Sequence, residues 1–165
     1  MKVFLTVALI IVGLLGCTGQ QTTKPRDNSE PEVLSVADND TEMAEAINKA
    51  RMSIDSFDSA LQSANTNYSF FALKAYLKNS NEHVWLRNIT LNGGVYKGVL
   101  DNLPKSTAVQ KVGDTISISS SIISDWMYLD NQKLRGGYSI RLLRKRMTEE
   151  ERNQFDIESG FVIEE

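Results

Sequence analysis

The chain of 165 residues has a single cysteine, a single histidine, three prolines and two tryptophans. One cysteine, Cys17, excludes an internal disulfide and a zinc site built from thiolates. One histidine, His83, leaves only carboxylates as its partners in a catalytic metal site, so we expect no metal and no cofactor. The sequence has no internal repeat, and its net charge of -3 argues against a nucleic-acid partner.

The one long hydrophobic run lies at the start of the chain, from Val3 to Leu15, directly after Lys2. A basic residue, an apolar segment of about a dozen residues and a small residue before the cut are typical of a secretory signal peptide. The run is too short to remain as a spanning helix. We therefore predict a signal peptide over residues 1–16, outside the folded domain.

Cys17 follows Leu14, Leu15 and Gly16, and this position resembles the bacterial lipobox, whose cysteine receives a lipid and becomes the new N-terminus. The alternative is an unmodified cysteine at the end of an ordinary signal peptide. Thr18 rather than aspartate comes next, which by resemblance to Gram-negative lipoproteins favours the outer membrane. This implies a lipid-anchored protein of the bacterial cell envelope, facing the periplasm, with the membrane as its partner through Cys17.

Residues 17–40 contain almost no large apolar side chain before Val33. Such a segment cannot bury enough surface to offset the entropy lost on ordering. We predict a flexible tether over residues 17–40, followed by one domain over residues 41–165, which is long enough for a single core.

An amphipathic helix is predicted from Thr41 to about Gln62, because apolar residues recur at steps of three and four. Alternation of apolar and polar residues then predicts strands over residues 68–78, 83–91 and 95–100. Asn92-Gly93 is a strong hairpin signal between the last two strands.

A fourth strand is expected after Gly113 and a fifth over residues 126–129. Beyond Gly136-Gly137 the spacing of Ile140, Leu143 and Met147 predicts a helix, and Thr148 to Glu151 has the spacing of a capping box that begins a last helix. The order predicts an α+β fold: an N-terminal amphipathic helix, an antiparallel five-stranded sheet or small open barrel, and C-terminal helices.

Five short motifs in this order resemble the YegJ-like family of bacterial proteins, and the resemblance covers about residues 41–150. The motifs are Glu82-His83-Val84-Trp85-Leu86, Gly98-Val99-Leu100-Asp101-Asn102-Leu103-Pro104, Gly113-Asp114-Thr115-Ile116, Ile123-Ser124-Asp125-Trp126-Met127-Tyr128 and Gly136-Gly137-Tyr138-Ser139-Ile140-Arg141. Ser139 stands where the family often has threonine. The resemblance implies the limits of the domain and a bacterial origin, and it implies no activity, substrate or cofactor.

His83, Ser124 and Asp125 are the residues from which a catalytic site would have to be built. Ser124 and Asp125 are adjacent, so they are expected on opposite faces of a strand, and no nucleophile elbow is present. A structural histidine is the favoured interpretation of His83.

Trp85, Trp126 and Tyr128 form the aromatic group of interest. Trp126 and Tyr128 share the phase of one strand, and Trp85 lies in another strand that could neighbour them. Core packing is the favoured interpretation, and a groove for a ligand or peptide is the alternative.

Asp125 and Arg141 are the polar pair that we would test first. A bidentate pair between them would lock the C-terminal helix onto the sheet. The functional alternative is an anionic ligand held by Arg141 near the Gly136-Gly137 turn.

Three hypotheses for function follow from these patterns. The first is a non-enzymatic binding or interaction domain with an envelope protein or peptide as its partner, because no motif brings a nucleophile, a base and oxyanion donors together. The second is an enzyme of unrecognised type that uses Asp125 and His83. The third is a purely structural envelope component.

Overall fold

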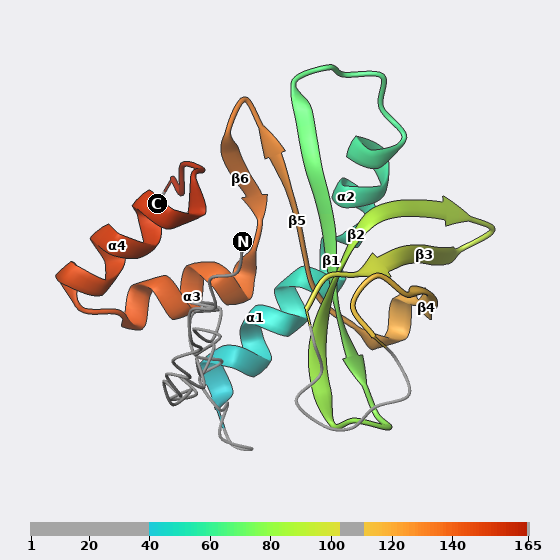
Figure 1. Ribbon diagram of the computed structural model, residues 1–165, viewed down its shortest axis with the longest axis horizontal. Helices are drawn as coiled ribbons and strands as arrows, with labels where there is room; N and C mark the ends of the chain where they lie inside the picture. The colour runs from blue at the N-terminus through green and yellow to red at the C-terminus, as the bar shows by residue number, and fades with distance from the viewer. Residues whose placement is uncertain (1–39, 103–110, 165) are drawn as a thin grey trace, which may run out of the picture. The chain divides into compact units, whose positions relative to one another are not determined.

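The computed structural model describes residues 40–102 and 111–164. The predicted signal peptide, Cys17 and the tether up to residue 39 lie outside the described residues, as does most of the connector after the third strand. The elements, shown in Figure 1, are α1 (Thr41–Met52), α2 (Ile54–Leu61), β1 (Tyr68–Leu77), β2 (Glu82–Asn92), β3 (Val95–Leu100), β4 (Thr115–Ser119), the 3-10 turn η1 (Ser120–Ile122), β5 (Ile123–Asp130), β6 (Lys133–Gly136), α3 (Tyr138–Arg146) and α4 (Glu149–Ser159).

The strands form one antiparallel sheet in the order β4-β3-β2-β1-β5-β6. This confirms the predicted α+β class with helices at both ends of the order. The described sheet has six strands, so the prediction of five was wrong. The missed strand, β6, has only four residues and follows a tight turn in which Asn131 and Gln132 both have positive φ.

The β2–β3 hairpin is present, with its turn one residue later than predicted. Asn92 pairs with Val95, and the two residues between them, Gly93 and Gly94, have φ values of 58° and 78°. Glycine reaches this left-handed region without a steric penalty, so a Gly-Gly pair takes the turn in preference to Asn-Gly.

The N-terminal helix is interrupted at Ser53, where a continuous helix to Gln62 was expected. The Ser53 hydroxyl donates to the Lys49 carbonyl at 2.7 Å, in competition with the backbone, and also lies 2.8 Å from the Tyr138 hydroxyl. A serine that bonds back to the preceding turn bends or ends a helix. The break lets α1 and α2 each lie on the sheet.

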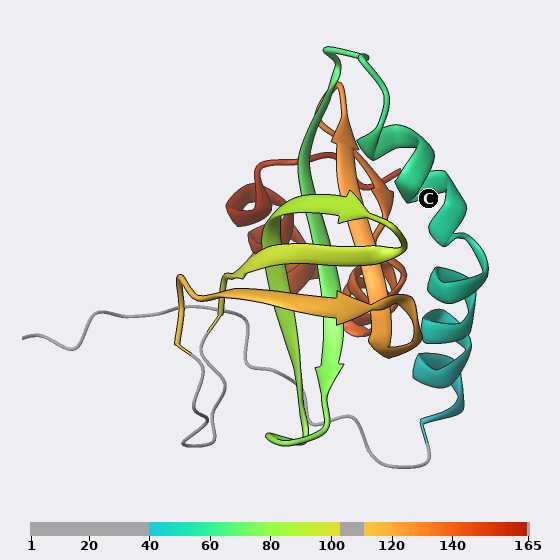
Figure 2. The same ribbon diagram turned by 90° about the vertical axis from the view of Figure 1, so that its right-hand side faces the viewer.

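The sheet separates two hydrophobic layers. The first face carries Leu73, Ala75 and Trp126 and is covered by α1 and α2, which lie on one side of the sheet in Figure 2. The second face carries Ala72 and Met127. Side chains of α3 and of the segment after α4 pack against it, including Ile140, Phe161 and Ile163.

Two features near the C-terminus hold α4 and the last residues in place. Thr148 and Glu151 form the predicted capping box at the start of α4. After Gly160 the chain turns back to the sheet edge, where Val162 makes a parallel bridge with Lys133 and its carbonyl accepts from Leu134 N at 2.8 Å. Along residues 40–102 and 111–164, no helix has the length and apolar character needed to cross a membrane.

Candidate functional site

An irregularity in the β1–β5 pairing creates a polar cluster on the second face. Lys74 pairs with Asp125, but the next residue, Ala75, pairs with Ile123, so Ser124 is an extra residue in β5. Such a bulge redirects side chains locally and is common beside functional sites. The expectation that Ser124 and Asp125 point to opposite faces was therefore wrong: both make their contacts on the face that carries Lys74 and His83.

Asp125 has no exposed surface, and donors from β5 and α3 surround its carboxylate. Oδ1 accepts from the backbone N–H groups of Trp126 at 2.8 Å and Tyr138 at 3.1 Å. Oδ2 accepts from Ser139 twice, from N at 2.8 Å and from Oγ at 2.6 Å. A carboxylate in this position satisfies the first free N–H groups of α3 and complements the positive end of its dipole.

Burial of Asp125 raises the pKa of its carboxyl group, and the hydrogen bonds from Ser139 and Trp126 act in the opposite direction. Removing a charge from water favours the neutral acid, whereas donors aimed at the carboxylate favour the ion. The four hydrogen bonds from Trp126, Tyr138 and Ser139 use the lone pairs of the carboxylate. Asp125 therefore serves to hold the start of α3 against β5.

Lys74 lies beside this cluster and extends from the strand that pairs with β5. Its Nζ donates to Ser139 Oγ at 3.4 Å and sits 5.5 Å from the centre of the Trp85 ring. Burial lowers the pKa of the Lys74 amine, and the charge of Asp125 partly opposes the shift. An ammonium over an indole face is stabilised by the ring quadrupole.

His83 and Ser124 form a second pair at the same end of the sheet. His83 Nδ1 lies 2.7 Å from Ser124 Oγ, and that hydroxyl also donates to the Lys74 carbonyl at 3.3 Å. Because the Ser124 hydroxyl proton goes to the carbonyl, this network assigns the Nδ1 proton to His83 and leaves Nε2 as an acceptor. Partial burial lowers the pKa of His83, and the positive charges of Lys74 and Arg51 lower it further.

Trp126 and Tyr128 belong to the core, which agrees with the favoured interpretation. Their rings are stacked at 6.1 Å, Trp126 is 4 % exposed, and its Nε1–H donates to the Ala50 carbonyl at 2.9 Å. Trp85 packs on the opposite side of the sheet with Ala72 and Met127. The three aromatic residues therefore do not form one group: Trp126 and Tyr128 lie on the first face, where the half-buried Tyr128 packs beside Tyr68, and Trp85 lies on the second face.

Arg141 does not pair with Asp125, so the predicted bidentate pair is wrong. Its guanidinium binds backbone carbonyls instead: Nε donates to Gly136 O at 2.9 Å, Nη2 to Leu134 O at 2.7 Å and Nη1 to Glu164 O. Arginine presents several donors in a fixed planar fork, which suits converging carbonyls. Asp125 and Arg141 thus hold the start of α3 separately, one through its N–H groups and one through the preceding turn.

The glycines before α3 allow this arrangement. Gly136 has φ of 69°, and a Cβ atom there would overlap the carbonyl and ring of Trp126. Gly137 N donates to Trp126 O at 2.8 Å. Only glycine fits this position, because the chain passes directly over β5 in a left-handed conformation.

Lys74 and Ser139 are the site residues that the sequence analysis did not single out. Lys74 fell within the strand predicted over residues 68–78, and a lysine between apolar neighbours in that strand was the available signal. Ser139 was noted only as a position where the YegJ-like family often has threonine, because its role depends on where α3 begins. We name the group Lys74, His83, Trp85, Ser124, Asp125 and Ser139 the Lys74–Trp85 site.

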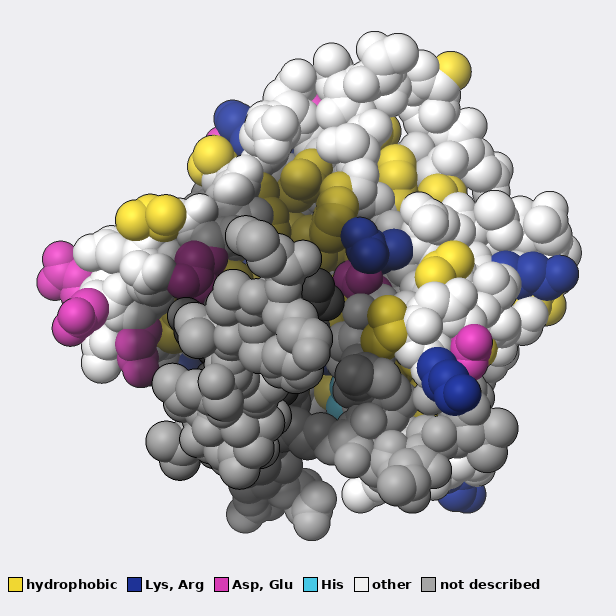
Figure 3. All heavy atoms as spheres, viewed as in Figure 1, with side chains coloured by type: hydrophobic (Ala, Val, Ile, Leu, Met, Phe, Trp, Pro, Cys, Tyr) yellow, Lys and Arg dark blue, Asp and Glu magenta, His cyan; other side chains and the backbone are white. Residues whose placement is uncertain are grey.

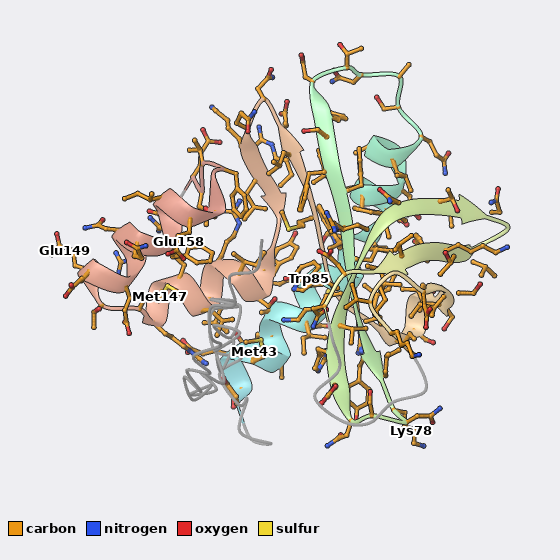
Figure 4. The ribbon with its side chains drawn as sticks, in the orientation of Figure 1. Met43, Lys78, Trp85, Met147, Glu149 and Glu158 are labelled. Carbon is orange, nitrogen blue, oxygen red and sulfur yellow. The ribbon has the colours of Figure 1, made fainter. Side chains whose placement is uncertain are left out.

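Trp85 is the residue of the Lys74–Trp85 site that Figure 4 labels, and it lies near the middle of the domain in that view. Figure 3, in the same orientation, shows hydrophobic side chains in a hollow in the upper half of the view, away from the middle where Trp85 is labelled in Figure 4. No group of three or more histidine, cysteine, aspartate or glutamate side chains suited to a metal ion occurs within residues 40–102 and 111–164. The chemical character of the site is a lysine and a tryptophan above a buried acid.

In a comparison with known protein families, residues 40–163 match the family described as "Uncharacterized protein conserved in bacteria (DUF2314)". The chain is 34% identical over 100 residues to the uncharacterized protein YegJ of Escherichia coli, a match that covers 59% of this chain and 64% of that protein. It is also 37% identical over 79 residues to a putative ankyrin repeat protein of Neisseria meningitidis, covering 48% of this chain and 31% of that protein. The chain thus spans less than two thirds of either relative, and no solved structure matches it.

Proposed function

Since the chain belongs to this bacterial YegJ-like family, we propose that it is a lipid-anchored binding module of the cell envelope without catalytic activity of its own. In this proposal the lipid on Cys17 holds the protein at the outer membrane, facing the periplasm. Residues 17–40 act as the tether, and the domain that follows binds an envelope protein or peptide through the Lys74–Trp85 site.

The observation that carries the proposal is how the polar groups of the site are used. Ser124 and Asp125 are 2 % and 0 % exposed, and their oxygens are occupied by bonds within the domain. Trp85 and Lys74 are each only partly buried, so they remain available to a partner. A partly exposed tryptophan beside a charged group is a common centre of binding energy in protein interfaces.

An enzyme that uses Asp125 with His83 is less well supported by this geometry. The hydrogen-bond partner of His83 is Ser124, while Asp125 is held by Trp126, Tyr138 and Ser139. A nucleophile or base must reach a substrate atom within hydrogen-bond distance, which a fully buried carboxylate cannot do.

Cross-linking and pull-down of the anchored chain from its own membranes tests the binding role. We expect a partner to be captured by the wild-type chain and lost from Trp85→Ala. The matched control is Phe70→Ala, which removes another aromatic side chain, 49 % exposed, away from the site. Retained capture by Trp85→Ala, with both variants folded by circular dichroism, would rule out the site as the binding surface.

Anchoring is tested separately through Cys17. Mass spectrometry of the mature wild-type chain should show a lipid on this residue, and Cys17→Ser should move the protein from the membrane fraction to the soluble fraction. An unmodified Cys17 thiol in the mature chain would contradict the anchor and leave the binding role to be judged by the pull-down alone.

A further inference from the structure

The Lys74 amine has more hydrogen-bonding capacity than its surroundings use. An ammonium group carries three N–H donors and no acceptor. Among the described residues, Lys74 Nζ has one hydrogen bond, to Ser139 Oγ, and at 3.4 Å it is a long one. A partly buried charge with unused donors is costly, so a negatively charged acceptor would be stabilised here.

The nearest acid does not fill this role directly. The Asp125 carboxylate accepts four hydrogen bonds from Trp126, Tyr138 and Ser139, and it reaches Lys74 only through the Ser139 hydroxyl. Two of those donors are backbone N–H groups at the start of α3, which themselves complement the carboxylate charge. The Asp125 carboxylate therefore compensates the Lys74 charge only in part.

The other neighbours also favour an anion over a cation. The positive charges of Lys74 and Arg51 both act on the His83 ring and contribute to its lowered pKa, so the electrostatic potential of these two side chains at this end of the sheet is positive. The Arg51 Nε donates to Ile123 O at 2.8 Å at the beginning of β5. Lys74 Nζ lies over the Trp85 ring, 5.5 Å from its centre, and the part of this half-buried indole that the amine leaves uncovered supplies an apolar surface beside the charge.

We propose that the Lys74–Trp85 site binds a carboxylate attached to a flat apolar group. The carboxylate accepts hydrogen bonds from Lys74 Nζ, and the apolar group lies against Trp85. A single negative charge fits better than a phosphate dianion, because one ammonium is present and the Asp125 charge repels a second negative charge. This proposal rests on the binding role proposed above and specifies the chemistry of the ligand.

The test is a titration of the full chain in nonionic detergent micelles with phenylacetate, followed by NMR of the two indole Nε1–H signals. We expect the Trp85 signal to shift with saturation, while the Trp126 signal stays in place because its Nε1–H is bonded to Ala50 O. The neutral analogue 2-phenylacetamide should bind at least about tenfold more weakly, since it cannot make a charge-assisted hydrogen bond.

Lys74→Met keeps most of the side-chain stem and removes the donors, so it should also weaken phenylacetate binding about tenfold or more. The matched control is Lys78→Met, an exposed lysine just beyond the end of β1, far from the Trp85 label in Figure 4. Control binding should equal wild type. Replacement of a partly buried charge by an apolar side chain need not destabilise the domain, so we expect the Lys74→Met variant to fold. A melting curve checks this.

Equal binding of phenylacetate and phenylacetamide, unchanged binding by folded Lys74→Met, or no shift of the Trp85 signal would each overturn the carboxylate proposal. If phenylacetate fails but the membrane partner is still captured in a Trp85-dependent way, the ligand class is wrong and the binding role stands. Loss of Trp85-dependent capture would instead contradict the proposed function itself.

Discussion

Asp125 and Ser139 are joined by two hydrogen bonds to one carboxylate oxygen, from the serine N–H at 2.8 Å and from its hydroxyl at 2.6 Å. The bonds link the second residue of α3 to the bulged end of β5, fourteen positions earlier in the chain. The lysine that we assign to ligand binding is attached to the same serine. Fold stability and the binding site therefore share one residue.

Asp125→Asn should lower the free energy of unfolding by about 3 kcal/mol, because one carboxylate oxygen is replaced by an NH2 group, which cannot accept the two hydrogen bonds that this oxygen receives. Urea denaturation followed by circular dichroism measures the change. The matched control, Asp55→Asn on the exposed side of α2, should change the free energy of unfolding by less than about 0.5 kcal/mol. Equal effects from the two variants would mean that Asp125 does not hold α3.

Gly136→Ala should destabilise the domain much more than Gly160→Ala, although both glycines have nearly the same φ, 69° and 68°. A left-handed alanine alone costs about 1–2 kcal/mol. At Gly160 nothing lies within 4 Å of the added Cβ, whereas at Gly136 the Cβ overlaps Trp126. Thermal unfolding of the two variants measures the difference, because the backbone strain is common to both and the overlap with Trp126 is specific to Gly136→Ala. Similar melting temperatures would contradict the close approach of Gly136 to Trp126.

Arg141→Ala should lower the free energy of unfolding by about 2–3 kcal/mol, since three backbone carbonyls lose a charged donor. Arg141→Lys should recover only part of this loss, because one ammonium cannot reproduce the guanidinium fork. Lys145→Ala, at an exposed position on the same helix, serves as the control in the same denaturation assay. An unchanged melting temperature for Arg141→Ala would count against its structural role.

His83 should make the domain less stable as the pH falls from about 7 to about 5. Its pKa in the folded state is lowered from the ordinary value of 6.5, so in this window the unfolded chain takes up a proton that the folded chain does not. The raised pKa of Asp125 acts in the opposite direction, because protonation of the folded acid stabilises it as the pH falls. Asp40 and Asp156, whose pKa values are lowered, lose their contribution only at more acid pH.

A comparison of wild type with His83→Gln isolates the histidine contribution from that of Asp125. Denaturation at several pH values should show a smaller loss of stability toward pH 5 in the variant. An identical slope in the two proteins would show that the pKa of His83 is not lowered in the folded state.

The sequence was informative wherever one residue type has one dominant local use. The alternation in β1 and β2, the glycine turn near Asn92 and the capping box of Thr148 each reflect short-range physics, and all three elements are present. The break at Ser53 involves a contact with Tyr138, 85 residues away in the chain, which a local pattern cannot contain. β6 pairs with the neighbouring β5, but its four residues are too few to show an alternating pattern.

The same limit explains the candidate site. Asp125 was identified because an acid next to Trp126 in an apolar strand needs a partner, but Arg141 was the wrong partner. The bulge at Ser124 decides which face the acid uses, and the left-handed turn before α3 brings N–H groups to it. Both features arise from the pairing of distant segments, so Lys74 and Ser139 became visible only in three dimensions.

The bridge between Val162 and Lys133 has a further consequence for the solubility of the protein at high concentration. An uncovered edge strand offers free backbone N–H and C=O groups to an edge strand of another molecule. Folded proteins commonly cover such edges, which prevents aggregation. The residues after Gly160 cover the β6 edge of the sheet through this bridge, and the ion pair of Lys133 with Glu164 supports the contact. Trimming the chain after Gly160 should therefore raise light scattering at high protein concentration, whereas substitutions in the helices should not.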